Sequence, residues 1–111
     1  MVIHYDSHAM RACFAARPDV VEARLGAAPG RVLRVRFEGA TAYVVFGRDE
    51  SDARTQGRTV AAARANAFTI SAAGSTGNLA FFVVGPLNGA IASEIRSCFA
   101  QSARSSSPLA A

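Results

Sequence analysis

Three side chains near the N-terminus have the types and the spacing of metal ligands. In the segment HYDSH, His4, Asp6 and His8 share one face if the backbone is extended, and His4 and His8 lie one turn apart if it is helical. In the alternative interpretation, Asp6 caps a helix and the two histidines are partly exposed. We predict no metal and no other cofactor, and we keep a small metal-dependent enzyme around these residues as an alternative function.

The two cysteines are the next candidates for chemistry. Cys13 and Cys98 each lie on the apolar stripe of a predicted helix, and no histidine or lysine is adjacent to lower the thiol pKa. Two cysteines are also too few to hold together a small secreted fold. We therefore expect both side chains to pack in the core rather than to act as nucleophiles.

The remaining motifs argue against an enzyme. The segment GSTGN, residues 74–78, has the composition of a phosphate-binding loop but lacks the lysine and the following helix of such a loop, so a hairpin turn is expected. Asp49, Glu50 and Asp52 cluster at the start of a predicted helix, where acidic side chains stabilise the helix dipole. Both features have a structural explanation, and no catalytic residue is predicted.

Arginine and tyrosine are the strongest surface candidates. The chain has 12 basic residues of the lysine and arginine types, all of them arginine, and a net charge of +4. Arg34, Arg36 and Tyr43 are expected on one face of a hairpin, and Arg54 and Arg58 lie one turn apart on the next helix. Arginine beside an aromatic ring can stack a base or bind an acidic protein. These five residues are the predicted site for an anionic partner, and nucleic acid is one such partner.

Length and composition set the organisation of the chain. The 111 residues, of which 50% are hydrophobic, predict one domain over residues 1–104 and a disordered tail over 105–111. No apolar stretch approaches the roughly 20 residues that span a bilayer, and no secretory leader is recognisable. A soluble cytoplasmic protein that binds no membrane is expected.

Two helical segments are predicted in the N-terminal part of the chain. Asp6 or Ser7 can cap the first, and Tyr5 and Met10 are placed to form a hydrophobic staple across its start. A proline then suits the first turn of a second helix, which is expected over residues 18–25 because a glycine follows as a natural stop.

Alternating apolar residues then predict two hairpins, each followed by a helix. In the first hairpin, Gly39-Ala40 is expected to form a two-residue loop. The second hairpin is expected to turn at GSTGN, and the helices after the hairpins are expected over 48–67 and 85–103. The first loop sets the expected cross-strand pairs of one apolar face: Phe37 with Ala42, Val35 with Val44, and Leu33 with Phe46.

This order of elements predicts an α+β fold of two layers. Four antiparallel strands are expected under helices on one face, in the order α-β-β-α-β-β-α. The second strands of the two hairpins, GATAYVVFG at 39–47 and GNLAFFVVG at 77–85, share Gly, Ala, Val and Gly in register. Both are therefore expected to lie inside a sheet that helices cover.

The strand LAFFVV, residues 79–84, is apolar on both faces. The long helices are expected to cover one face only, so the other face needs the N-terminal helix or a second copy of the chain. We expect a homodimer, although the set of side chains that faces outward depends on a register that the sequence leaves open. The predicted interface with a second copy or another protein consists of Leu79, Phe81, Val83 and Ile70.

The C-terminal part of the chain resembles a known superfold. From Ala63 to Ala103, an asparagine after the central helix (Asn66), a hairpin and a final amphipathic helix are similar to the type III secretion chaperone-like superfold and its small sensory-transduction-like relatives. The resemblance implies a homodimer that binds an extended partner polypeptide and performs no chemistry. This chain differs from such chaperones in its basic charge and in lacking a predicted additional strand.

The leading functional prediction is a non-catalytic, homodimeric protein-binding module. It would act as a chaperone or adaptor, or as an inhibitor of a host complex. The first alternative is a nucleic-acid-binding protein that uses the arginine and tyrosine face, whose affinity would fall steeply with salt. The second is the metal-dependent enzyme described above.

Overall fold

A computed structural model of the chain describes residues 3–26, 31–64 and 69–105. The strands in these ranges are β1 (Ile3–Tyr5), β2 (Val20–Leu25), β3 (Arg31–Phe37), β4 (Ala40–Phe46), β5 (Ile70–Thr76), β6 (Leu79–Val84) and β7 (Ala103–Ser105). The helices are α1 (Ser7–Ala15), α2 (Glu50–Arg64) and α3 (Gly89–Ser102). A five-stranded antiparallel sheet has the order β2-β3-β4-β6-β5, and β1 pairs with β7 in a second, two-stranded sheet.

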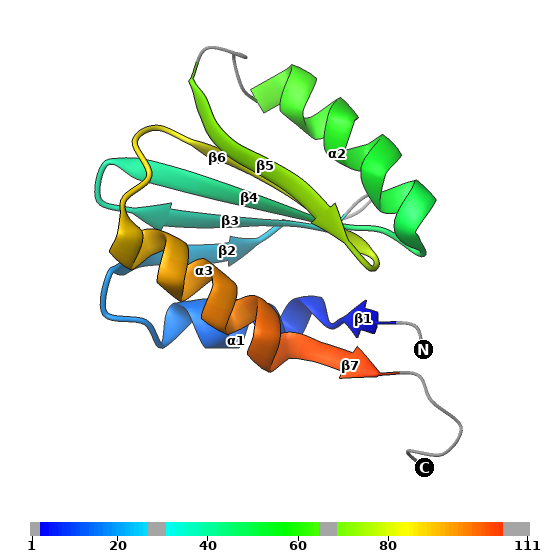
Figure 1. Ribbon diagram of the computed structural model, residues 1–111, viewed down its shortest axis with the longest axis horizontal. Coiled ribbons are helices and arrows are strands. Elements are labelled where there is room, and N and C mark those ends of the chain that lie inside the picture. Colours follow the sequence, from blue (N-terminus) through cyan, green and yellow to red (C-terminus); the bar gives the residue numbers. More distant parts are fainter. Residues whose placement is uncertain (1–2, 27–30, 65–68, 106–111) are drawn as a thin grey trace.

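Helices cover both faces of the large sheet, which gives three layers (Figure 1). α2 packs on β6, β4 and β5 from one side, whereas α1 packs on β2 and on α3 at the other side. The predicted α+β class is confirmed, but the predictions of four strands, of the element order and of helices on one face are wrong. The periodicity of a helix shows which of its sides is apolar, and it does not show which face of the sheet that side will cover.

Residues 18–25 are a correction to the predicted second helix. Val20–Leu25 is strand β2, which pairs antiparallel with β3 along its length. Two adjacent β-branched valines favour an extended backbone. Because β3 offers a row of backbone hydrogen-bonding groups, the strand satisfies the polar groups of this segment and also buries part of Val20 and Leu25 against the core.

The first hairpin has a different register from the predicted one. Its loop is Glu38-Gly39, and Phe37 pairs with Ala40, so every partner is shifted by two residues. Gly39 has a φ of +86°, a backbone conformation that favours glycine and explains why the turn centres one position earlier. A shift of two residues keeps each side chain on its predicted face. All six residues of the predicted apolar face are buried: Leu33, Val35, Phe37, Ala42, Val44 and Phe46.

Helix termini follow the sequence closely. The Asp6 carboxylate accepts hydrogen bonds from the backbone N–H groups of His8 and Ala9 at the start of α1. Asn88 caps α3 in the same way, with its Oδ1 2.8 Å from the backbone nitrogen of Ile91. The predicted hydrophobic staple is consistent with the structure, because the residues on either side of the first cap, Tyr5 and Met10, are buried in one cluster.

Gly57 brings α2 close to the sheet. A Cβ atom at Gly57 would lie only 2.7 Å from the Cβ of Ala80 on β6. The helix therefore packs at a distance that any larger residue at this position would increase. The predicted end of this helix, including Asn66, lies outside the described residues.

The two chain ends pair with each other. β1 runs antiparallel to β7, and Tyr5 pairs with Ala103 in this small sheet. Neither strand was expected, because three residues are too few to show a periodic pattern. The predicted domain end at 104 and the disordered tail from 105 are corrected at one residue, since Ser105 belongs to β7; residues 106–111 lie outside the described part.

A disulfide joins α1 and α3, the two helices on the face of the sheet opposite α2 (Figure 1). Cys13 of α1 and Cys98 of α3 are bonded, with their Cα atoms 5.7 Å apart and 85 positions apart in the sequence. Both cysteines lie on apolar stripes as predicted, but the expectation of two separate packed thiols is wrong. Each helix pattern is local, and only the packing of α1 on α3 brings the two sulfurs together.

Candidate functional site

Of the two edge strands of the large sheet in the described part of the chain, β5 has the more exposed residues. This strand is an edge, with β6 as its only neighbour in the sheet. Its sequence, ISAAGST, contains no charged residue and no proline, and Ser71, Ala73, Gly74 and Ser75 are all exposed. An uncharged edge of this length presents backbone N–H and C=O groups to which another strand can bond.

The other edge strand, β2, has a different character. Its sequence, VVEARL, places Glu22 and Arg24 on the face that carries the arginines of β3. Both edge strands have an irregular register near their first residues, so that feature does not distinguish them. Charge does distinguish them, because charged side chains on an edge strand discourage pairing with another chain.

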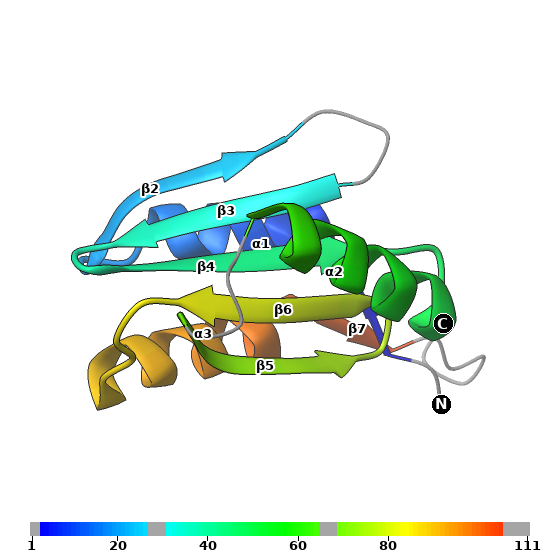
Figure 2. The same ribbon diagram turned by 90° about the horizontal axis from the view of Figure 1, so that it is seen from above.

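A groove runs beside β5 on the side of α2. Its volume is about 240 Å³, and its floor includes Gly57 of α2 and Phe82 of β6. Figure 2 shows β5 as the outermost strand of its side of the sheet, with α2 lying over β4 and β6. The groove and the open edge therefore adjoin each other. The residues that line the groove are Arg54, Gly57, Arg58, Ala61, Ile70, Ala73, Gly74, Ser75, Ala80, Phe81 and Phe82.

The residues predicted for a protein interface lie mainly inside the molecule. Leu79 and Val83 are 0% and 1% exposed, in one cluster with residues of α1 and α3. Phe81 is half-buried, with its ring 5.2 Å from that of Phe99, and Ile70 is half-buried beside α2. The premise that the long helices cover one face of β6 only is wrong, because α2 packs against Ala80 on one face, whereas residues of α1 and α3 cluster with Leu79 and Val83 on the other.

The predicted anion-binding residues form two separate groups. On the sheet, Arg34 pairs directly with Tyr43, and Arg36 lies on the same face. Arg54 and Arg58 instead line the groove between α2 and β5. The structure thus brings three of the five residues together and places the other two at the open edge.

The sheet group is partly neutralised. Arg34 Nη2 lies 3.1 Å from the Glu22 carboxylate. The hydrogen bond from Arg34, together with the nearby charges of Arg36 and Arg24, lowers the pKa of Glu22 against the opposing effect of burial. Tyr43 stacks on Phe82 of the neighbouring strand with ring centroids 4.9 Å apart. One face of the tyrosine ring is therefore already occupied within the chain.

The helix group differs in its pairing. Arg54 lies 2.9 Å from Glu50 one turn earlier, in an exposed ion pair. Arg58 is exposed, and among the described residues it has no ion pair within 4.0 Å. The rim of the groove therefore carries positive charge that the described chain neutralises only in part.

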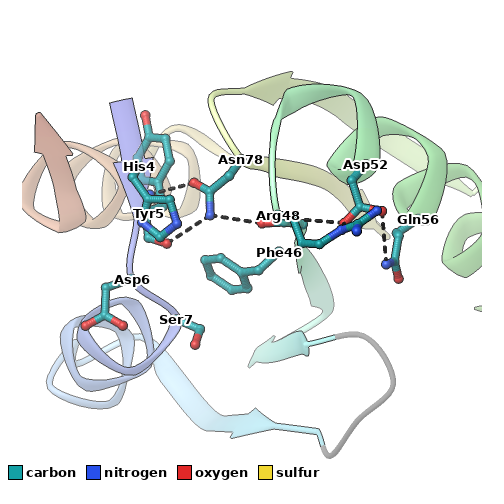
Figure 3. Close-up of a pocket in the computed structure, with 10 residues that line it drawn as sticks. His4, Tyr5, Asp6, Ser7, Phe46, Arg48, Asp52, Gln56 and Asn78 are labelled. Carbon is teal, nitrogen blue, oxygen red and sulfur yellow. Dashed lines mark hydrogen bonds and ion pairs between the residues drawn. The ribbon is translucent and has the colours of Figure 1, made fainter. Parts of the chain in front are cut away.

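The candidate metal ligands do not come together as one site. Asp6 is used as the cap of α1, and His4 and His8 are both exposed. His4 and Asp6 line a cleft of about 500 Å³, which His8 does not reach (Figure 3). Across the described ranges, no group of three or more histidine, cysteine or acidic side chains has the arrangement of a metal site.

Asn78 holds this cleft together. Its Oδ1 accepts a hydrogen bond from the Tyr5 backbone nitrogen at 2.6 Å, and its Nδ2 donates to the carbonyl oxygens of Tyr5 and Gly47. At the other wall, the Asp52 carboxylate accepts a hydrogen bond from the backbone N–H of Arg48 at 2.8 Å, which lowers the Asp52 pKa. These polar groups already have partners that stabilise the fold (Figure 3).

Glu94 of α3 is an acidic group with the opposite shift. Burial raises the pKa of its carboxyl group, and the charge of nearby Asp19 raises it further against the effect of Arg17. Its Oε2 is buried and has no hydrogen-bond partner in the described structure. The carboxyl group lies near Asp19 and Arg17, in the turn between α1 and β2, and Glu94 is not among the residues that line the β5 groove.

In comparisons with known proteins, no family model matches the chain, and no curated protein or solved structure matches it either. The resemblance to the type III secretion chaperone-like superfold stays a prediction. In the described residues, no helix is long and apolar enough to cross a membrane.

Sequence reasoning missed the open edge itself. The absence of charge in ISAAGST is visible in the sequence and is unusual beside the arginine-bearing strands before it. That signal gains meaning only when β5 is known to be an edge, because central strands are uncharged for another reason, their burial.

Proposed function

We propose that this protein is a non-catalytic protein-binding module that offers the β5 edge to an extended segment of a partner protein. The observation that carries the proposal is an uncharged, exposed edge strand of seven residues beside a groove. Strand addition of this kind takes its affinity from main-chain hydrogen bonds and its selectivity from pockets for alternate side chains. Here β5 would supply the main-chain hydrogen bonds, and the groove would supply a pocket for side chains.

The backbone of β5 has the geometry that strand addition needs. Thr76 and Leu79 flank the two-residue loop between β5 and β6, where hairpins of this type have a hydrogen-bonded pair. Since such pairs alternate along an antiparallel ladder, Ala73 and Ser75 direct their backbone N–H and C=O groups away from β6. These outward groups are the proposed contacts with the partner strand.

A partner strand explains the groove better than a second copy does. If two copies paired through β5, each would bring a strand without any acidic residue to the rim that carries Arg54 and Arg58. The homodimer predicted from the sequence also loses its original reason, because β6 is covered within the chain. Dimerisation is therefore an outcome to be measured rather than part of the proposed binding mode.

The test selects peptides from a random decapeptide library displayed on mRNA, using the disulfide-bonded protein as bait. We expect enriched peptides to protect the outward amides of β5 from hydrogen exchange. Ala73→Pro removes an outward N–H without removing a bond to β6, so it should abolish enrichment. Val21→Pro, at an exposed position of the other edge strand, is the matched control and should leave enrichment intact.

Two results would overturn the proposal. One is enrichment of peptides that bind the wild type and Ala73→Pro equally; the other is the absence of any enriched peptide. Should proline disturb the fold, Ser75→Lys places a charge at the same edge and serves as the second variant. Light scattering on the free protein measures whether it is a monomer or a dimer. A stable dimer that Ser75→Lys dissociates would show that β5 pairs with β5 of a second copy, and it would also overturn the proposal of a partner strand.

A second candidate function, nucleic-acid binding, has one specific observation in its favour. Arg24, Arg34 and Arg36 lie on one face of β2 and β3, next to Tyr43, and β2 lies clear of α2 (Figure 2). Such a face would contact phosphates, with an affinity that falls as salt rises. A fluorescent random oligonucleotide should bind at low salt and lose most of its affinity in the double variant Arg24→Gln, Arg36→Gln. Absence of binding at low salt removes this candidate.

The proposal also includes the cellular compartment in which the protein acts. A cytoplasmic location was predicted from the sequence, whereas disulfides form and persist in oxidising compartments. The Cys13–Cys98 bond therefore favours an oxidising compartment for the functional protein.

A further inference from the structure

We infer that the strand that β5 receives is acidic, with two carboxylates two residues apart that contact Arg54 and Arg58. This inference rests on the proposed function, since it names the chemistry of the partner at the same edge. Its basis is the position of the two arginines relative to β5, and not the overall charge of the chain.

The side chains of an added strand would reach the arginines. Ala73 and Ser75 point their side chains into the groove that Arg54 and Arg58 line from α2. A strand added to β5 continues the sheet, so every second side chain of that strand also points to the α2 side. These side chains meet the exposed rim of the groove, where the guanidinium groups lie.

The spacing of the two arginines suits a strand. Residues four apart on a helix are separated by about 6 Å along its axis. Residues two apart on a strand are separated by about 6.6 Å and share one face. Arg54 and Arg58 can therefore each contact one of two carboxylates at positions i and i+2 of an extended segment.

Charged groups around the groove neutralise the two arginines only weakly. β5 has no charged side chain, and the nearest acidic residue on α2, Glu50, pairs with Arg54 across a surface where both side chains are more than half exposed. Exposed pairs of this kind are weak and exchange readily. Arg58 has no ion pair within 4.0 Å in the described part of the chain. An acidic strand would add the counter-charges that the groove lacks, and a basic strand would meet repulsion.

The experiment uses three fluorescent decapeptides that share a threonine- and valine-rich strand sequence. They differ at two positions, i and i+2, which carry glutamate, glutamine or lysine. We expect the glutamate peptide to bind about tenfold more tightly than the glutamine peptide at low salt. The lysine peptide should bind more weakly than both, and the preference for glutamate should shrink as salt rises.

The variants assign the preference to the groove. Arg54→Gln with Arg58→Gln should remove the difference between the glutamate and glutamine peptides. The matched control, Arg11→Gln with Arg96→Gln, makes the same change of charge at exposed positions of α1 and α3, which lie on the other face of the sheet (Figure 1), and should leave the difference intact. Both double variants alter exposed side chains, so thermal unfolding should show that each remains folded.

The possible outcomes distinguish a failure of the acidic preference from a failure of strand addition at β5. If all three peptides bind equally and protect the β5 amides, strand addition stands and the acidic preference is overturned. If the glutamate preference survives Arg54→Gln with Arg58→Gln, the two arginines are not its source and the inference fails. If no peptide binds and the decapeptide library also enriches nothing, the proposed function fails with it.

Discussion

The two edge strands of the large sheet differ in charge, and this difference bears on whether each can pair with a strand of another chain. β2 and β5 are similar in length, both are irregular near their first residue, and each has a helix packed nearby. β2 carries Arg24 and Glu22, of which Glu22 pairs with Arg34 of β3, whereas β5 carries no charge at all. Because charged edge strands discourage pairing with another chain, the difference supports the proposal that β5 is the binding edge and that the charges of β2 protect the other edge.

The largest expected effect comes from the disulfide, which acts on the β2 side. Replacing both Cys13 and Cys98 by alanine should lower the free energy of unfolding by about 2–5 kcal/mol, since the bond closes a long loop. α1 packs directly on β2, so amide exchange should accelerate more in β2 than in β5. Urea denaturation and hydrogen exchange measure the two effects. Equal acceleration at both edges would show that the disulfide stabilises the whole sheet uniformly.

The next effect should appear on the β5 side. Gly57→Val places a side chain where even a Cβ atom would lie 2.7 Å from Ala80, and we expect a loss of about 1–3 kcal/mol. The helix must move away from the sheet, so the groove widens and peptide binding at β5 weakens. Ala62→Val is the control, because it changes an exposed position of the same helix to the same residue. Valine is a better helix former than glycine and a poorer one than alanine, so helix propensity alone predicts a loss only for Ala62→Val. A loss in Gly57→Val no larger than that in Ala62→Val would therefore contradict the role of the close contact with Ala80.

Removing the charges of β2 tests the comparison directly. The double variant Glu22→Thr, Arg24→Thr should turn β2 into an uncharged edge and raise the average mass in solution toward that of a dimer. The exchanged variant Glu22→Arg, Arg24→Glu keeps two charges on the strand and should remain at the mass of the wild type. Light scattering over a range of protein concentrations measures both. An unchanged mass for the threonine variant would mean that charge does not protect this edge.

The smallest effect concerns pH at the same strand. The pKa of Glu22 is lowered in the folded protein, so its stabilising contribution is present above its unfolded value near 4.5 and is lost as pH falls through the folded value. Glu22→Gln should therefore be slightly less stable than the wild type at pH 7, and the difference should vanish at strongly acidic pH. Paired denaturation curves at the two pH values measure it. A difference that persists in acid would have to come from packing.

The sequence by itself determined the local features of this protein. Asp6 caps α1 as predicted, because a cap needs only a side-chain oxygen within one turn of the backbone N–H groups that it accepts from. The two hairpins and the buried face of the first one were also predictable, since side chains alternate along a strand whatever it packs against.

Only the tertiary structure decided which elements meet. The strand at 20–25 replaces a predicted helix because β3 is there to pair with it, and the Cys13–Cys98 bond depends on two helices at opposite ends of the chain. The order of the strands made β5 an edge. The packing of α1 and α3 on one face of the sheet buried Leu79 and Val83, and the position of α2 on the other face put Arg54 and Arg58 at the β5 groove, apart from Arg34 and Arg36. Contacts between distant segments depend on the packing of all layers at once, and a local pattern contains no information about its distant partner.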